Sequence, residues 1–420
     1  MNLEKIRFNI KLGWLVIILY FYVYNPVFIA IGIGSVKVVL LYVFLYSIVK
    51  TKILHYIGFF KIELFLTSLL VMYSIITSVR INEFAFHQAY LFFMWFVESI
   101  YVPIGLVVVF NDQFKKYGWD KLILWIGLIA GVLSLILIVY PELNEYVRYK
   151  LIASSGEKHD RYESIRGFGF AEALRGAYGM AQGIILGICL NLVKEKWSYI
   201  VVALLLLISI AFNARTGLIA FPVSIVILLS RLRSNRRLTI SILATVLLIY
   251  NVDFSSFAFF SNYEKTFDWI SVGFLEATEV IQGDNSSFVG KTLLVDEKFL
   301  PVSRFDWLLG TGHFGPGIDR VDNGYYYLLW FGGWCMMMSV IVFLIYMFIR
   351  LARRKEYYYS VLFFILLLIF SVKSNYLFNP SSIARLFGIY YVYTILNHKA
   401  KLNSLFRIFL NTTKEIEYNL

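Results

Sequence analysis

The sequence predicts an all-α, polytopic integral membrane protein. Of the 420 residues, 59% are hydrophobic and only 16% are charged, whereas soluble domains carry about 25% charged residues. Apolar runs long enough to form membrane helices recur along the chain, and basic segments separate them. No internal repeat and no soluble-domain pattern interrupts this series, so residues 1–420 are expected to form a single membrane domain.

We expect about twelve transmembrane helices, each placed to within a few residues. They are expected at about residues 13–30, 33–49, 58–78, 91–110, 121–140, 177–193, 197–213, 216–230, 238–253, 323–349, 357–373 and 383–397. The first run follows Met1–Lys11 without a small-residue cleavage site, which predicts an uncleaved anchor. Asn25-Pro26 interrupts this run, because proline removes a backbone donor, and Lys37 lies early in the next.

The basic residues fall mainly in short loops on one face of this arrangement. More than half of the 39 lysines and arginines lie there, in the segments Lys5–Lys11, Lys50–Lys61, Lys115–Lys121, Lys194–Lys196, Arg231–Arg237, Arg350–Lys355 and Lys399–Lys414. The positive-inside rule makes this face cytoplasmic, so both termini are expected in the cytoplasm. The rule accounts for most of the net charge of +12 without a nucleic-acid partner, and it gives Arg350–Lys355 a purely topological role.

Two outward loops are expected to be long, at about residues 141–176 and 253–321. Loops of this length in a compact protein usually have a function. Four segments on the same outer side carry arginine, glycine and other polar residues: Ser164–Gly179, Asn213–Gly217, Arg304–Gly333 and Lys373–Arg385. We therefore expect the functional site on the outer side of the membrane.

Arg215 is the most informative of these residues. It is the only formal charge between Trp197 and Ser230, a stretch that is long enough for two short membrane helices. The orientation above places the turn that carries Arg215 on the outer face. Arginine inside a membrane is costly and usually functional, although an arginine at this depth can also extend its side chain to the lipid headgroups.

The residue types on the outer side fit a phosphate-bearing substrate. Arginine binds phosphate oxygens in a bidentate fork, consecutive N–H groups in a glycine-rich turn can hold an anion, and a carboxylate or an imidazole can accept a proton from a hydroxyl. The candidate catalytic residues are Arg215, Asp322 and His313. The candidate substrate-binding residues are Arg166, Arg175, Arg304, Arg320, Asn323 and Gly312.

Each of these residues also has a simpler interpretation. The loop arginines can be solvated charges, Asp322 and Asn323 can cap the helix that follows them, and His313 can be a solvated loop histidine. Glu98, inside the fourth expected helix, is a second intramembrane charge that can pair with a basic residue.

The energy sources available on the outer side limit which substrates are possible. ATP is absent there, so a reaction must draw its free energy from the substrate itself. An undecaprenyl-diphosphate-linked sugar has this property, because its diphosphate is a good leaving group and its lipid tail is accommodated in the bilayer. Arginines can stabilise the leaving diphosphate without a metal, and no clustered carboxylate motif is present, so neither a metal nor a cofactor is expected.

Three segments resemble motifs of the O-antigen polymerase family, which is related to the O-antigen ligases. The segment LLGTGHFGPGIDRVDNGYYYLLWFGG is similar to the family pattern of G-x-G, a spacer, Asp-Asn or His-Asn, and a glycine. The matching residues are Gly310, Gly312, Asp322, Asn323, and Gly332 or Gly333. NARTG at 213–217 resembles the family's Arg-Ser/Thr-Gly turn, and RGFGFAEALRG resembles its upstream arginine-containing loop. The resemblance covers Arg166 to the end of the tenth helix.

The resemblance implies a membrane glycosyltransferase in the bacterial cytoplasmic membrane that polymerises lipid-linked repeat units of O-antigen or capsule. A polysaccharide chain-length regulator is a candidate partner. In the ligase branch a histidine usually precedes the asparagine, and this chain has Asp322 there, which favours a polymerase. An O-antigen ligase and a polysaccharide or lipid transporter remain the alternatives; transporters tend to have two similar halves, which this chain lacks.

Overall fold

The structure is a computed structural model and consists of helices. The residues that it describes are 3–49, 52–81, 86–152, 170–171, 177–213, 215–230, 303–313, 324–354, 357–373 and 378–397. These ranges contain no named strand, and two isolated β-bridges fasten the loop after the first helix, Val27 with Gly34 and Phe28 with Ile152. The predicted all-α fold class is confirmed.

The helices of the N-terminal part are α1 (Leu3–Tyr24), α2 (Ser35–Val49), α3 (Lys52–Ile57), η1 (Gly58–Phe60), α4 (Lys61–Arg80), α5 (His87–Phe96), η2 (Val97–Tyr101), α6 (Val102–Val109), α7 (Asn111–Tyr117), α8 (Trp119–Val139), α9 (Pro141–Tyr146) and η3 (Val147–Leu151). Those that follow are α10 (Ala177–Leu192), α11 (Tyr199–Asn213), η4 (Arg215–Ile219), α12 (Ala220–Ser230), α16 (Arg304–Leu309), α17 (Gly324–Ala352), α18 (Tyr357–Lys373) and a last helix at 382–397.

Within the described ranges, four helical stretches are long and apolar enough to cross a membrane: His55–Arg80, His87–Val109, Trp119–Val139 and Gly324–Ala352. The expected count of twelve spans is therefore not confirmed. Every expected range contains a helix except 238–253, which lies outside the described residues, but several of these helices are short. At about 1.5 Å per residue, a helix of about 16 residues covers only about 24 Å of a hydrocarbon core of about 30 Å.

The first expected outer loop begins with helical structure. Residues Pro141–Tyr146 form α9, and a π-helical turn, η3, follows it. Pro141 favours this start, because proline is pre-organised for the first turn of a helix. In the second expected loop, residues 303–313 are described, and they form α16 and a turn.

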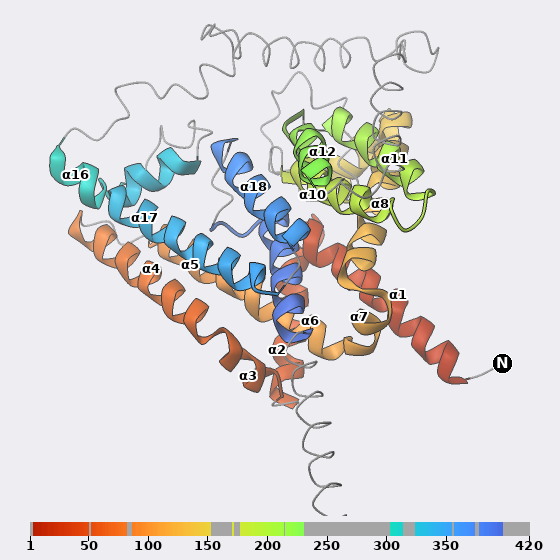
Figure 1. Cartoon of the computed structure of the whole chain (residues 1–420), viewed down its shortest axis with the longest axis horizontal. Coiled ribbons are helices and arrows are strands. Elements are labelled where there is room, and N and C mark those ends of the chain that lie inside the picture. Colours follow the sequence, from red (N-terminus) through yellow and green to blue (C-terminus); the bar gives the residue numbers. More distant parts are fainter. Residues whose placement is uncertain are drawn as a thin grey trace, which may run out of the picture.

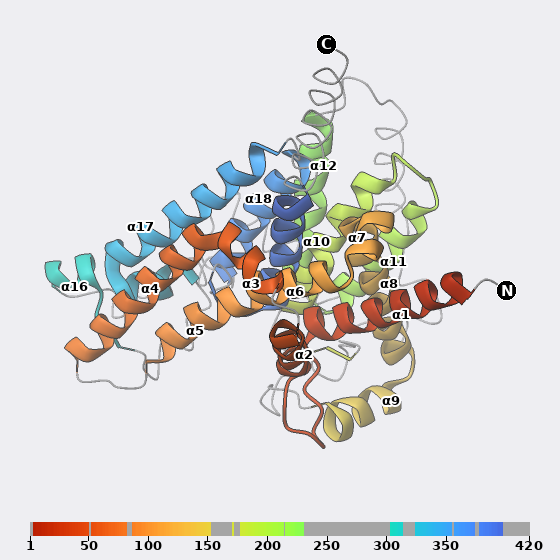
Figure 2. The same ribbon diagram turned by 90° about the horizontal axis from the view of Figure 1, so that it is seen from below.

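The long helices fall into two groups. In Figures 1 and 2, α4, α5 and α17 run side by side, whereas α8, α10, α11 and α12 form a second group that is seen nearly end-on in Figure 1. Helix α18 packs against α17 of the first group and against α10 and α12 of the second. Every residue of α10 is buried, so this helix forms the centre of the second group.

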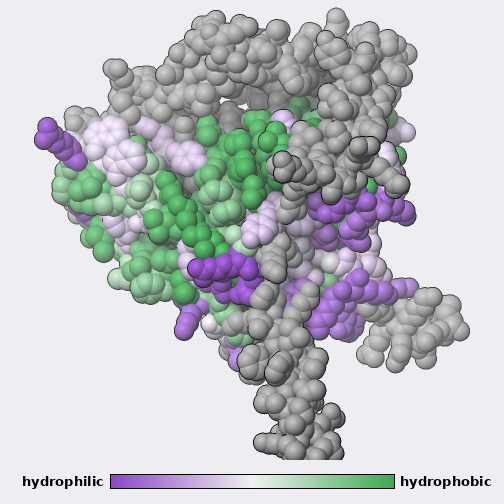
Figure 3. Space-filling view, in the orientation of Figure 1, coloured by the Kyte–Doolittle hydropathy of each residue, from purple (hydrophilic) through white to green (hydrophobic). Residues whose placement is uncertain are grey.

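The outer surface of the first group is apolar. Figure 3 shows a mainly hydrophobic surface over α4 and α17. Its exposed apolar side chains include Phe65 and Ile76 of α4 and Val342 of α17. A continuous apolar surface of this kind marks contact with a membrane or with another protein, and together with the four apolar helices it gives the chain the features of a membrane protein.

Candidate functional site

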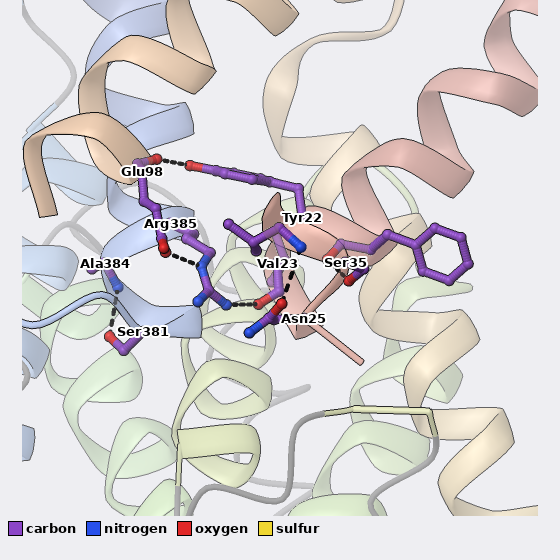
Figure 4. Close-up of polar contacts among 10 residues, drawn as sticks. Tyr22, Val23, Asn25, Ser35, Glu98, Ser381, Ala384 and Arg385 are labelled. Carbon is purple, nitrogen blue, oxygen red and sulfur yellow. Dashed lines mark hydrogen bonds and ion pairs between the residues drawn. The ribbon is translucent and has the colours of Figure 1, made fainter. Parts of the chain in front are cut away.

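A buried ion pair lies where α1, η2 and the last helix meet. Arg385 Nε donates to Glu98 Oε2 at 2.7 Å, and the side chains are only 3% and 8% exposed. Arg385 Nη1 also donates to Val23 O, at 3.2 Å (Figure 4). The guanidinium thus joins the end of α1 to the middle of the helix His87–Val109.

The local backbone explains how Glu98 and Arg385 come together. Glu98 lies in the π-helical turn η2, and its carbonyl oxygen accepts a hydrogen bond from Tyr22 OH. A side chain at Gly388 would bring its Cβ to 2.2 Å from Ser99 O, so only glycine lets the last helix approach this turn so closely. Single π-turns inside α-helices are frequent at functional sites.

This pair gives Glu98 the basic partner that the sequence left unnamed. Charges in the apolar interior of a membrane protein are rare and usually lie at functional sites. The charged pair also fixes three chain segments relative to one another, because either group alone would be left buried and uncompensated. Both roles are compatible with the geometry.

The turn that carries Arg215 packs closely on the start of α10. Arg215 is the first residue of η4, and the structure describes its backbone, whereas its side chain lies outside the described part. A Cβ on Gly217 would lie 2.2 Å from Gly179 O, and one on Gly183 would lie 2.5 Å from Gly217 O. The turn and the N-terminal half of α10 therefore touch backbone to backbone.

A chain of buried polar side chains leads to this turn. Gln182 Nε2 donates to Tyr24 OH at 3.0 Å and to Tyr178 OH at 3.3 Å. Tyr178 OH shares a hydrogen bond of 3.3 Å with Ser209 Oγ, and Asn213 Nδ2 donates to Ser209 O at 2.7 Å. Asn213 ends α11 directly before the turn. These hydrogen bonds link α1, α10 and α11 directly before the turn, while Gln182 Oε1 and Asn213 Oδ1 are buried with no hydrogen-bond partner among the described residues.

The described part of the second outer loop ends in a turn that is attached to α17. Thr311 N–H donates to Trp330 O at 2.8 Å, and Gly312 N–H donates to Phe331 O at 3.0 Å. The Gly312 amide, a candidate anion donor, therefore holds the loop on α17. His313 follows on the exposed side of the turn.

Glycine is required at both sides of this contact. Gly310 and Gly333 have φ values of +81° and +64°, and Gly333 kinks α17. A Cβ on Gly310 would lie 2.1 Å from Phe331 O, and one on Gly333 would lie 2.4 Å from Leu308 O. Arg80 at the end of α4 donates to Gly310 O. The loop can thus pack into the kink of α17 because glycines at the contact have no side chain that would clash.

The structure brings only some of the candidate residues together. Gly312 and His313 follow α16, which begins with the exposed Arg304. Helix α16 lies across the molecule from α10 and α12, the helices next to the Arg215 turn (Figures 1 and 2). The remaining candidates lie outside the described residues: Arg166, Arg175, Arg320, Asp322 and Asn323.

A second buried ion pair corrects the purely topological role expected for Arg350. Its Nη1 donates to Glu63 Oε1, and its Nη2 donates to Phe59 O at 2.6 Å. Glu63 is fully buried, and its Oε1 also accepts a hydrogen bond from Tyr391 OH. The only sequence signal for this pair was an acidic residue near the start of an apolar helix, which by itself named no partner.

Comparison of the chain with protein families, with curated proteins and with solved structures finds no match to any of them.

Proposed function

We propose that the chain is a membrane glycosyltransferase that polymerises undecaprenyl-diphosphate-linked oligosaccharide repeat units into O-antigen or capsular polysaccharide. It acts at the outer face of the bacterial cytoplasmic membrane, with twelve spans and both termini in the cytoplasm. It uses the diphosphate ester of the donor as its energy source and needs neither a metal nor a cofactor. A chain-length regulator is a candidate partner.

The contact between the Arg215 turn and the start of α10 carries this proposal. Arg175 precedes Ala177, the first residue of α10, by two positions, and two residues span at most about 7 Å. Gly179 in the first turn of α10 touches Gly217, so the segment that follows Arg175 in the chain meets the turn that begins with Arg215. Two arginine-containing motifs that are distant in the sequence thus have neighbouring residues in contact, which suits a shared diphosphate site.

In the proposed reaction, Arg215 and either Arg175 or Arg166 hold the donor diphosphate. Arg304 is less suited to this task, since α16 lies across the molecule from α10 and α12, the helices that contact η4. Asp322, or alternatively His313, takes the proton of the acceptor hydroxyl. The hydroxyl oxygen then bonds to the anomeric carbon as the bond to the diphosphate oxygen breaks, and attack opposite the leaving group inverts the configuration.

The test replaces Arg215 in a strain that lacks the chromosomal gene. Loss of one charge-stabilising group typically lowers turnover by about 10²–10³-fold, so Arg215→Ala should leave glycans of a single repeat unit. Arg215→Lys should retain part of the polymer, because lysine keeps the charge but not the bidentate fork. Lys196→Ala, an exposed lysine before α11, is the matched control and should give normal polymer. Full-length polymer with Arg215→Ala at normal protein levels would refute the proposal.

A ligase that transfers finished glycan to the lipid A core would use similar groups. The glycan pattern of the deletion strain separates the two activities. Loss of a polymerase leaves the lipid A core with one repeat unit, whereas loss of a ligase leaves it with none.

The buried Glu98–Arg385 pair is the observation that most favours a transporter, because intramembrane charges also line transport pathways. Purified protein in detergent micelles distinguishes the two classes. A glycosyltransferase lengthens a lipid-diphosphate-linked glycan without separate compartments, and a transporter forms no new glycosidic bond.

A further inference from the structure

A groove between α2, α4 and α5 lies outside every segment that the proposed function uses. Its volume is about 910 Å³, within the range of roughly 300–1,000 Å³ that is usual for ligand sites. Leu41, Phe44, Met72 and Phe93 line it, and each of these side chains is more than half exposed. The groove is therefore open sideways, toward the lipid that surrounds a membrane protein.

One end of the groove is cationic. Among the described residues that line it, Lys37 alone carries a formal charge. Lys37 is the third residue of α2, its side chain is exposed, and no carboxylate of the described residues forms an ion pair with it. An ammonium group beside an apolar groove complements a phosphate group that is attached to a hydrocarbon chain.

The length of the groove fits one leaflet. Lining residues extend along α2 from Lys37 to Ile48, which is about 17 Å at about 1.5 Å per residue and close to half of a hydrocarbon core of about 30 Å. Toward the far end, Ser47 Oγ donates to Phe44 O at 2.6 Å and contacts Tyr101 OH at 3.0 Å. The Ser47 and Tyr101 hydroxyls are satisfied within the protein, and Thr67 Oγ1 is buried without a partner among the described residues. Most of the other lining side chains are apolar, so the groove offers an acyl chain mainly apolar contacts.

The lining is poorly suited to a helix from a second copy. Membrane helices pack closely through glycine, alanine and other small residues. Most of this lining is Leu, Ile, Val, Phe and Met, it contains neither glycine nor alanine, and its small residues are Ser47, Thr67 and Ser68. A flexible hydrocarbon chain can follow such an irregular surface more closely than a rigid helix can.

We propose that this groove binds one acyl chain of an anionic phospholipid whose phosphate contacts Lys37. The site is separate from the proposed glycosyl transfer and does not depend on it. The lipid would act as a resident part of the α2–α4–α5 surface.

Native mass spectrometry of the full chain, reconstituted with phosphatidylglycerol and transferred to detergent, tests this site. The wild-type chain should retain phosphatidylglycerol in preference to phosphatidylcholine. One lysine–phosphate contact near a membrane surface corresponds to roughly fivefold in affinity, so Lys37→Gln should weaken retention about fivefold and Lys37→Arg should preserve it. Leu41→Trp, which fills the groove, should displace the lipid, and Val342→Trp on the lipid-facing surface of α17 is its control.

Four results would overturn the proposal. Equal retention of phosphatidylglycerol by Lys37→Gln and by the wild type would show that Lys37 does not contact the phosphate. Retention that Leu41→Trp and Val342→Trp change equally would place the lipid elsewhere. Preferential displacement of phosphatidylglycerol by undecaprenyl phosphate would identify the groove as a polyprenyl site, and a dimer that Leu41→Trp dissociates would identify it as an interface between copies.

Discussion

Two buried ion pairs in the described part of the chain differ in their position along the helices. Both join the first hundred residues to the C-terminal part, Glu98 with Arg385 and Glu63 with Arg350. Glu63 is the third residue of α4 and Arg350 lies in the last turn of α17, whereas Glu98 lies in the middle of the helix His87–Val109. One pair thus fastens helix ends, and the other lies within the apolar interior.

Their surroundings differ accordingly. The Arg350 side chain is 17% exposed, and its guanidinium lies over the rings of Phe60 and Tyr391, at 5.3 and 5.8 Å. Arg385 is only 3% exposed and depends on Glu98 and on the carbonyl of Val23. An arginine at a helix end can reach polar surroundings when its partner is lost, whereas a carboxylate in the interior cannot. Breaking the Glu98–Arg385 pair should therefore cost more stability than breaking the Glu63–Arg350 pair, although both are carboxylate–guanidinium pairs.

The largest loss of stability is expected for Arg385→Ala. Breaking a buried pair by removing one partner typically costs about 3–5 kcal/mol, because the Glu98 carboxylate stays buried without compensation. We expect a large fall in the melting temperature of the detergent-purified protein. The double variant Glu98→Gln with Arg385→Met should recover most of it, since two neutral residues leave no unpaired charge. A double variant that is as unstable as the sum of the single variants would show that the two side chains do not interact.

The next effect is that of Glu63→Gln. The amide keeps the shape of the side chain and can still accept from Tyr391 OH, while Arg350 loses its counter-charge. Because Arg350 is partly exposed, we expect a loss of about 2 kcal/mol, less than the full cost of breaking a buried pair. The same melting measurement checks this. A larger loss than that of Arg385→Ala would reverse the comparison.

Local sequence patterns predicted where helices occur, but they did not predict which distant side chains pair with each other. Hydrophobic runs located helices in eleven of the twelve expected ranges. The first helix was expected to continue to residue 30, but α1 ends at Tyr24, directly before Asn25-Pro26, where Asn25 has a φ of +45°. The same runs overstated span length, because apolar composition alone does not show where a short helix stops. Glu98 was recognisable as an intramembrane charge, but Arg385 lies 287 residues away, and no local period links them.

The site shows the same limit. The N–H groups of the glycine-rich G-x-G segment were expected to hold an anion, and in the structure Gly310 and Gly312 have positive φ. The sequence alone did not show that the Gly312 N–H, which was expected to bind an anion, instead donates to Phe331 O. The π-turn at Glu98 was equally hidden, since it is defined by backbone hydrogen bonds and not by residue type.

The smallest expected loss of stability comes from breaking an exposed ion pair. This variant tests whether burial, and not ion pairing as such, causes the losses expected for Arg385→Ala and Glu63→Gln. Lys121 Nζ lies 3.0 Å from Glu195 Oε2, and the side chains are 37% and 46% exposed. Water already solvates both charges, so Glu195→Gln should cost less than about 0.5 kcal/mol and leave the melting temperature nearly unchanged. High salt should weaken this pair and leave the interior pair intact, because exposed charges are screened far more than buried ones. If Glu195→Gln destabilised the protein as much as Glu63→Gln, ion pairing itself, and not its depth in the fold, would set the cost.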